Sequence, residues 1–268
     1  AGKHIDLLII THVDYDHIGG VLKWFNTNSP DEGFVKRVWM NDDVKIEDHT
    51  NLDNNAAHEA SLLELLAGNN VTHENQIVSG KETAFDWGKI YVLAPTTEDH
   101  NRMSDKVSAN LDNKENNNYK KNIKNLVAEK WSVDHVTPEN DASIAFLLHT
   151  NDGENDLFLG DANIDTVMTA IDSLKDFEKP LHCKWVKLSH HGSKKNFKPE
   201  LLTLVRGENY IFSSNGDCYG HPDKEVAAEL IDKTTATLWF NYLERGQSMI
   251  TEQDKIDYPG VMDRIKEI

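Results

Sequence analysis

The chain has 268 residues, of which 38% are hydrophobic and 27% charged, so it can bury a substantial core, and wholesale disorder is excluded. Its 45 acidic residues outnumber the 28 basic ones, and the formal net charge of −17 argues against tight, sequence-independent binding of nucleic acid. No apolar run approaches the roughly 20 residues that a membrane-spanning helix needs, so we expect no membrane segment.

Strands and helices alternate in the first hundred residues. The apolar run Ile5–Ile10 predicts a buried strand, and apolar residues at helical spacing follow Gly19-Gly20. Further predicted elements are strands at 34–40 and 89–94 and a helix at 56–67. The chain begins almost directly at the first of these strands, which is typical of a trimmed N-terminus.

The stretch 96–140 differs in composition, because it is polar, rich in asparagine and poor in core-forming residues. It predicts an insertion or a solvated loop, with a short helix near Leu126–Trp131. A lid over a site is the alternative, and the solvated loop is favoured over it.

Regular structure resumes after this insertion. Predicted strands at 143–149 and 156–159 flank the turn 151–155, which is a hairpin signal. The pattern then predicts helices at 164–174, 199–205 and 223–231, strands at 184–188 and 210–213, and a closing hairpin of 237–242 with 247–251. Because strands and helices intermix without a linker or repeat, residues 1–268 are expected to form a single α/β domain.

Two cysteines, Cys183 and Cys218, lie outside any C-x-x-C pair, which excludes a zinc knuckle or a redox motif of that type. Two buried thiols in a reducing compartment are the favoured interpretation, and one disulfide is the alternative. We therefore expect a cytoplasmic protein.

Residues that commonly bind metals follow four of the apolar runs. They are, in chain order, His12, Asp14, Asp16 and His17, then Asp161, then the pair His190-His191, then His221. Because strand ends at one edge of a layered α/β fold converge on a crevice, we expect these side chains to meet. Imidazole and carboxylate are the usual ligands of zinc, and carboxylate-rich shells also suit manganese or iron.

Each of these residues also has a plainer interpretation. Asp161 can cap the helix 164–174, His221 can be an ordinary loop histidine, and His190-His191 can form a solvated turn. The His12–His17 cluster fits such an explanation least, because four ligand-type residues within six would repel one another without a cation. The other histidines are interpreted as surface or satisfied core residues, among them His49, His58, His73, His100, His135 and His182.

Taken together, these motifs resemble the metallo-β-lactamase-fold hydrolases, whose hallmark is H-x-H-x-D-H after a strand, then a separate His, a later Asp and a final His. THVDYDHIGG matches the first motif, with Asp14 where the family usually has its second His. FLGDA, KLSHHGS and YGHP match later motifs, and the last is found in one branch. That branch includes the hydrolase domain of bacterial DNA-uptake (competence) proteins and choline-phosphate esterases. The resemblance spans about residues 5–250.

The resemblance implies an αββα four-layer sandwich, here lacking part of its N-terminal strands, with a dinuclear metal site at its edge. The ligands that it implies are His12, Asp14, Asp16, His17, a bridging Asp161, and His191. The catalytic residues that it implies are Asp16, His190 beside the ligands, and His221 as a proton donor to the leaving group.

Two departures from the family pattern bear on the metal. Asp14 in place of His makes the ligand set harder, which favours manganese or iron beside zinc. The separate middle His has no clear counterpart, and Glu139 or Asp141 is the candidate to replace it.

The expected function is hydrolysis of a phosphodiester or related phosphate ester by a hydroxide held on two divalent ions, zinc or manganese with iron as a further alternative. One competing function is hydrolysis of a carbonyl ester, lactone, thioester or β-lactam at the same site. Another is a non-enzymatic sensor or assembly subunit with a structural metal. Nucleic acid is disfavoured as a substrate by the net charge, although Lys194 and Lys195 after HHGS can meet a phosphate backbone. The oligomeric state is left open.

Overall fold

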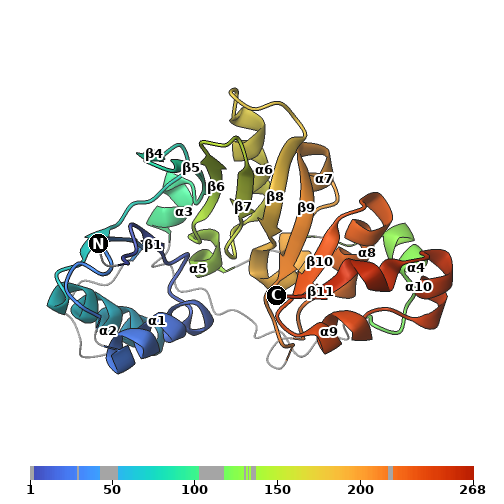
Figure 1. The fold of residues 1–268 in the computed structure, drawn as a ribbon, viewed down its shortest axis with the longest axis horizontal. Helices are drawn as coiled ribbons and strands as arrows, with labels where there is room; N and C mark the ends of the chain where they lie inside the picture. Colours follow the sequence, from blue (N-terminus) through green and yellow to red (C-terminus); the bar gives the residue numbers. More distant parts are fainter. Residues whose placement is uncertain are drawn as a thin grey trace.

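The computed structural model describes residues 3–28, 30–42, 54–102, 118–129, 131, 133, 137–216 and 220–268, and its architecture is mixed α/β (Figure 1). Within these residues the strands form two sheets. The smaller sheet has three parallel strands in the order β1 (Leu8–Ile9), β2 (Arg37–Trp39) and β3 (Thr72–Glu74).

The larger sheet has eight strands in the order β11-β10-β9-β8-β7-β6-β5-β4. Their bounds are β4 Glu82–Phe85, β5 Gly88–Ala94, β6 Ala145–Thr150, β7 Asn155–Phe158, β8 Leu181–Lys187, β9 Val205–Phe212, β10 Thr237–Phe240 and β11 Ile265–Glu267. Strands β4 to β7 pair antiparallel, which confirms the hairpin predicted around 151–155. Strands β7 to β11 pair in parallel, and parallel pairs need crossover connections.

Helices provide several of these connections and flank the sheets. They are α1 Tyr15–Asn28, α2 Asn54–Gly68, α3 Thr97–Asn101, α4 Ile123–Ala128, α5 Pro138–Asp141, α6 Ile164–Ser173, α7 Leu201–Leu204, α8 Lys224–Lys233, α9 Leu243–Ser248 and α10 Glu252–Asp257. Three 3-10 turns join them: η1 Ser189–Gly192, η2 Lys194–Asn196 and η3 Val261–Arg264.

Buried apolar side chains form three cores. The first contains residues of α1, α2 and the small sheet, such as Leu22 and Val38. In the second, Trp39 of the small sheet shares a cluster with Phe146 of the large one. The third joins the large sheet to residues of α6 and α8. Because successive side chains of a strand point to opposite faces, Leu147 belongs to the third core while its neighbour Phe146 belongs to the second.

Helix α1 begins at Tyr15, four residues before the glycines where the sequence pattern placed its start. The backbone amides of His17 and Ile18 donate to the carbonyl of Asp14, at 2.9 and 3.0 Å. This early start places Asp16 and His17 in the first helical turn, directly after the strand end.

The predicted closing hairpin is wrong. Strand β10 pairs in parallel with β9 and β11, and the segment expected to return as a strand instead contains the end of α9. Met249 and Ile250, which follow α9 directly, are buried in the third core without belonging to a strand. A short apolar run does not distinguish a strand from another buried segment.

The described part of the 96–140 stretch includes a helix that packs on the protein. Helix α4 contacts α8, and its Ile123 and Leu126 are fully buried (Figure 1). The helix begins three residues earlier than Leu126, where the sequence placed its start. Residues 103–117, 130, 132 and 134–136 lie outside the described residues.

One cysteine and all the helices discussed above lie within the described residues. Cys183 is buried on β8 and is not part of a disulfide, and burial raises the pKa of its thiol to about 12. Cys218 lies outside the described residues, as do His49 and His135. None of the helices that the structure describes combines the length and apolar character needed to cross a bilayer.

Candidate metal centre

Three separate turns of the chain bring the predicted ligands to one place. His12 follows β1, and Asp16 and His17 lie in the first turn of α1. Asp161 follows β7, and the pair His190-His191 follows β8 in η1. His12 and Asp161 are only 1% and 2% exposed, so the centre of this group is shielded from solvent.

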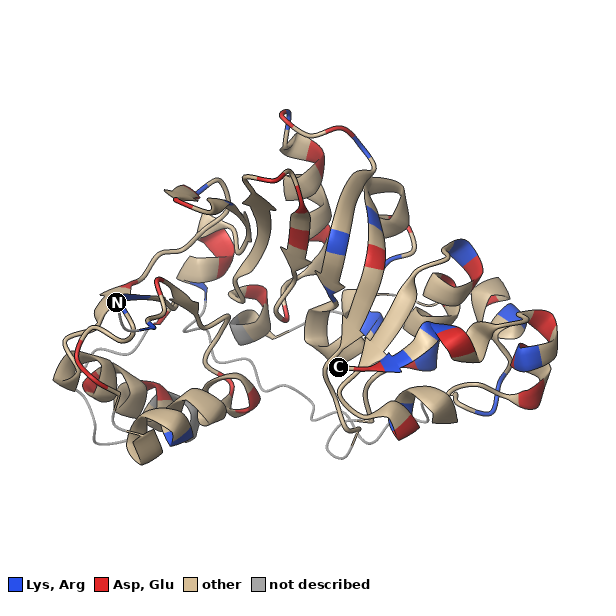
Figure 2. Ribbon diagram, viewed as in Figure 1, with Lys and Arg blue, Asp and Glu red and all other residues tan. Residues whose placement is uncertain are grey.

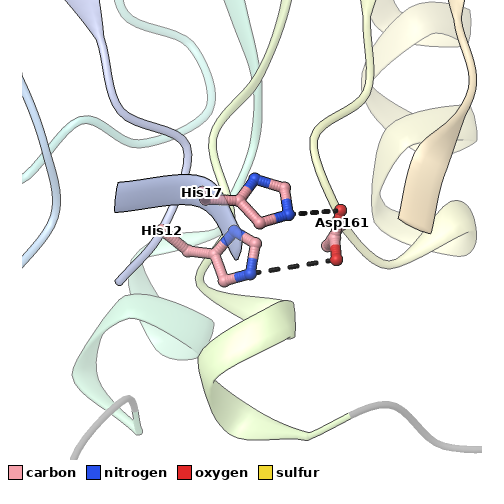
Figure 3. A group of neighbouring side chains, drawn as sticks. All are labelled: His12, His17 and Asp161. Atoms are coloured by element: carbon pink, nitrogen blue, oxygen red, sulfur yellow. Dashed lines mark ion pairs between the residues drawn. The ribbon is translucent and has the colours of Figure 1, made fainter. Parts of the chain in front are cut away.

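Asp161 lies at the middle of the first group of ligand atoms. Its carboxylate is 3.8 Å from His12 Nε2 and 3.4 Å from His17 Nε2, and Figure 3 shows both rings pointing these atoms at it. Asp14 lies beside the same group, with Oδ2 3.5 Å from His12 Nε2. His12, His17 and Asp161 each offer a ligand atom within 4.8 Å of the others.

A second group shares His17 with the first. His191 Nε2 lies 3.0 Å from Asp16 Oδ2, and His17 Nε2 lies 3.8 Å from the same oxygen. His191 Nε2 is also 4.0 Å from Asp161 Oδ2, so the two groups are contiguous. His190 Nε2 lies 3.7 Å from Asp161 Oδ2 but is not in either group, so the geometry favours His191 as the ligand of the pair.

Small polar side chains orient the first two imidazoles. Thr11 Oγ1 contacts His12 Nδ1 at 3.2 Å and His17 Nδ1 at 3.0 Å, and Ser143 Oγ contacts His12 Nδ1 at 3.3 Å. With Nδ1 engaged in this way, Nε2 is left to face Asp161. Such outer contacts fix the ring orientation of metal-binding histidines. Sequence reasoning missed Thr11 and Ser143, although Thr11 directly precedes the first motif.

The paired histidines are held in the same way. His190 Nδ1 donates to Asn196 Oδ1 at 3.0 Å, while the amide of Asn196 donates to the carbonyl of Asp161 at 3.0 Å. His191 Nδ1 donates to the carbonyl of Ser213 at 2.8 Å. With Nδ1 bonded to Ser213, His191 directs Nε2 toward Asp16. A proton or a cation between Nε2 and the carboxylate accounts for their separation of 3.0 Å.

The backbone at the paired histidines is strained. His190 and His191 have φ values of 44° and 57°, and Gly192 follows at 85°. A non-glycine residue in this left-handed region costs about 1–2 kcal/mol, and such strain clusters at functional sites. A solvated turn has no need for two such residues in succession, so the plainer interpretation of this pair is disfavoured.

Asp161 does not cap the following helix. The cap of α6 is Asn163, whose side chain accepts the amides of Asp165 and Thr166. The amide of Asp161 instead donates to Ser143 Oγ at 2.9 Å, which leaves its carboxylate to the centre. Gly160 permits this turn, because it has φ of 52° and a Cβ there would lie 2.5 Å from Ser143 Oγ.

Electrostatics favour charged carboxylates in this centre. Burial raises the pKa of Asp161, but the close approach of His17 and the charges of the nearby histidines outweigh it and hold that pKa well below its usual range. Burial also opposes ionisation of Asp16, yet the hydrogen bond with His191 and the charge of His17 bring its pKa to about 2. Burial lowers the pKa of His190, which favours its neutral form.

His221 lies at the border of this group. Its ring centre is 5.2 Å from that of His190, and its Nδ1 is 3.6 Å from Oδ2 of the buried Asp223. Asp141 and Glu139 are the residues predicted to replace the missing middle His. Asp141 accepts a hydrogen bond from Asn163 at 3.1 Å, and the side chain of Glu139 lies outside the described residues.

The residues present fit a divalent cation. His12 Nε2, His17 Nε2 and Asp161 Oδ1 are buried without a hydrogen-bond partner among the described residues, although buried polar atoms are nearly always paired. Two ligand atoms about 2.1 Å from one ion lie about 3.0–3.4 Å apart at ordinary coordination angles. The separations of 3.4 and 3.8 Å around Asp161 are close to this spacing.

The metals that suit this site are inferred from its side chains alone. Imidazole and carboxylate together suit zinc, manganese or iron, and a centre with several such ligands suits hydrolysis. No protein-family model matches the chain, and no curated protein matches it either.

Proposed function

We propose that the protein is a metal-dependent hydrolase of a small phosphodiester or related phosphate ester. One observation carries this proposal. Four imidazoles from two separate turns of the chain, His12–His17 and His190-His191, are each oriented at Nδ1 by protein atoms, and their Nε2 atoms converge on two carboxylates. A structural role does not require strained backbone at His190 and His191, which supports catalysis over a purely structural metal.

We also propose that the fold is the four-layer αββα sandwich of the metallo-β-lactamase type. The three cores support this, because the second core has residues of both sheets while the first and third join each sheet to helices. In such an arrangement the loops after β1, β7 and β8 meet at one edge, where the ligands lie.

Two divalent cations would be held by the ligands named above, His12, Asp14, Asp16, His17, Asp161 and His191. When bound, they supply a coordinated water with a pKa of about 7 and stabilise negative charge on phosphoryl oxygens. Asp16 Oδ2 and His191 Nε2 face each other at 3.0 Å, a spacing that suits two ligands of one cation. His190 lies beside the ligands, with Nε2 3.7 Å from Asp161, and His221 is assigned as the proton donor to the leaving group.

Lysine pairing supports a small substrate over nucleic acid. Lys194, which follows the HHGS motif, pairs with Glu225 at 3.2 Å, and Lys198 pairs with Asp165 at 2.6 Å. Figure 2 shows basic positions interspersed with acidic ones along the ribbon, most densely around α4, α8 and α10. A polyanion requires a continuous basic track, whereas these lysines are matched by carboxylates of the same chain.

Elemental analysis and a substrate screen test this function together. Protein purified without chelator should contain up to two equivalents of zinc, manganese or iron. With the same metal added, it should hydrolyse bis(p-nitrophenyl) phosphate. Turnover of carbonyl esters, lactones or β-lactams alone would favour the competing hydrolase. Bound metal without turnover of any of these substrates would favour a sensor or assembly role.

A further inference from the structure

We infer that Tyr119 and Arg245 are positioning residues for His221, so that the 96–140 stretch and helix α9 both take part in forming the catalytic site. The inference rests on the proposed function, in which His221 is the proton donor. It begins from the backbone around His221, where three consecutive carbonyls are all bound by these two side chains.

The contacts are direct. The Tyr119 hydroxyl donates to the carbonyl of Pro222 at 2.8 Å. The guanidinium of Arg245 donates to the carbonyls of Gly220 and His221, the latter at 3.3 Å. Two side chains therefore restrain the peptide on either side of His221.

Arg245 is itself held on both sides. Its guanidinium carbon lies 4.6 Å from the centre of the Tyr119 ring, within the range of a cation–π contact. On the other side it packs against Gly216, where the Cβ of any other residue would collide with the guanidinium. Tyr119, Arg245 and the backbone at Gly216 form one packed unit, which we call the clamp.

The opposite side of the His221 segment rests on the paired-histidine turn. The amide of Asp223 donates to the carbonyl of Gly192 at 3.0 Å, and the amide of Lys194 donates to Asp223 Oδ2 at 2.9 Å. A Cβ at Gly192 would lie 3.0 Å from Pro222, so the two backbones approach closely. His221 is thus placed between the metal centre and the clamp.

The clamp matters because this backbone is intrinsically permissive. Gly216 and Gly220 both have φ near 80°, and glycine loses more conformational freedom on ordering than any other residue. A proton donor displaced by about 1 Å can lose much of its effect on rate. The bonds to three successive carbonyls reduce the conformational freedom of this backbone. One of them comes from Tyr119, a residue of the polar insertion.

The expected signature is a dependence on the leaving group. Proton donation matters for an alkoxide leaving group and little for p-nitrophenolate, which leaves without a proton. Weakening the clamp should therefore slow hydrolysis of an alkyl phosphodiester much more than hydrolysis of an aryl one. A role in stability alone would reduce both equally.

The test compares Tyr119→Phe and Arg245→Gln with the control Tyr258→Phe. The control also removes one tyrosine hydroxyl, which in the parent donates to Asp232 at 2.7 Å. Activity is measured on p-nitrophenyl methyl phosphate and on dimethyl phosphate. We expect Arg245→Gln to lower kcat for the alkyl substrate about 100-fold and for the aryl substrate less than fivefold, because general acid catalysis contributes about 10²–10⁴. Tyr119→Phe should show about a tenfold loss with the alkyl substrate, and Tyr258→Phe should show none. His221→Ala should show the largest contrast.

Hydrogen exchange gives a readout that does not depend on activity. The amide of Asp223, bonded to Gly192, should exchange about tenfold faster in Tyr119→Phe and in Arg245→Gln than in the parent, with or without metal, and at the parent rate in Tyr258→Phe. Equal losses on both substrates, or unchanged exchange at Asp223, would overturn the inference. If the parent turns over neither phosphodiester, the proposed function fails, and the exchange data still decide whether the clamp holds the segment.

Discussion

Two buried polar clusters in this molecule have opposite character. Lys224 and Asp254 are both 0% exposed and form an ion pair at 2.7 Å, in which the lysine also donates to the carbonyl of Lys121. Asp254 additionally accepts the amides of Ile123 and Thr251, at 2.6 and 2.9 Å. This cluster joins α4, α8 and α10, and its charged atoms have protein partners.

The first ligand group of the candidate metal centre is also buried, but its facing atoms are not paired within the described part of the chain. His12 Nε2, His17 Nε2 and Asp161 Oδ1 lack hydrogen-bond partners among the described residues, and they face one another. The comparison teaches that burial of charge does not by itself indicate function. In a saturated cluster each charged atom already has a protein partner, whereas convergent atoms without partners are suited to binding a ligand.

The largest expected effect concerns catalysis at the unsatisfied cluster. Asp16→Ala and His191→Ala should each lower kcat/KM for a phosphodiester more than about 100-fold, because even residues behind metal ligands affect activity by about 10–100-fold. Far-ultraviolet circular dichroism should show the parental fold. Asp172→Ala, an exposed acidic position on α6, is the matched control and should keep parental activity. Full activity in both site variants would show that the catalytic assignment is wrong.

Substitution in the saturated cluster of Lys224 and Asp254 should change the stability of the protein and not its metal binding. Lys224→Met should lower the free energy of unfolding by about 3–5 kcal/mol, because it leaves a buried carboxylate without its counter-charge. Lys124→Met breaks an exposed pair with Asp257 and should cost about 0–1 kcal/mol. Urea unfolding measures both, and the folded Lys224→Met protein should bind as much metal as the parent. If Lys224→Met lost its metal, the proposal that only the other cluster binds metal would be wrong.

Metal removal should destabilise the protein through the unsatisfied cluster alone. At free metal about 100 times the dissociation constant, binding to the folded state adds about 2.7 kcal/mol of stability. Thermal unfolding with zinc or manganese and with chelator measures this increment. Asp161→Asn should abolish the increment, whereas Lys124→Met should keep it. An unchanged melting temperature in the parent would contradict a metal site.

The smallest effect isolates the backbone strain. His191→Gly and His191→Ala both remove the imidazole, but only glycine adopts φ near 57° without strain. The glycine variant should therefore be more stable than the alanine variant by about 1 kcal/mol. Chemical unfolding of the metal-free variants makes this comparison, and the reverse order would indicate that the turn is not strained.

The sequence predicted most strand and helix positions in the middle of the chain but not the C-terminal end. The hairpin around 151–155 follows from local turn residues, so it is readable from sequence. The burial of Met249 and Ile250 cannot be assigned to a strand or to another element from sequence, because a short apolar run fits either. The packing of α9 against β10 and β11 decides it.

The sequence by itself determined the candidate ligands that lie close together in the chain, because His12, Asp16 and His17 are brought together by one strand end and one helical turn. It also indicated Asp161 and the paired histidines through their place after strands. Only the tertiary structure decided which atoms face the centre, since Ser143 and Ser213 orient His12 and His191 from distant positions in the chain. Contacts across such separations depend on how the sheets and helices pack, and no local pattern encodes them.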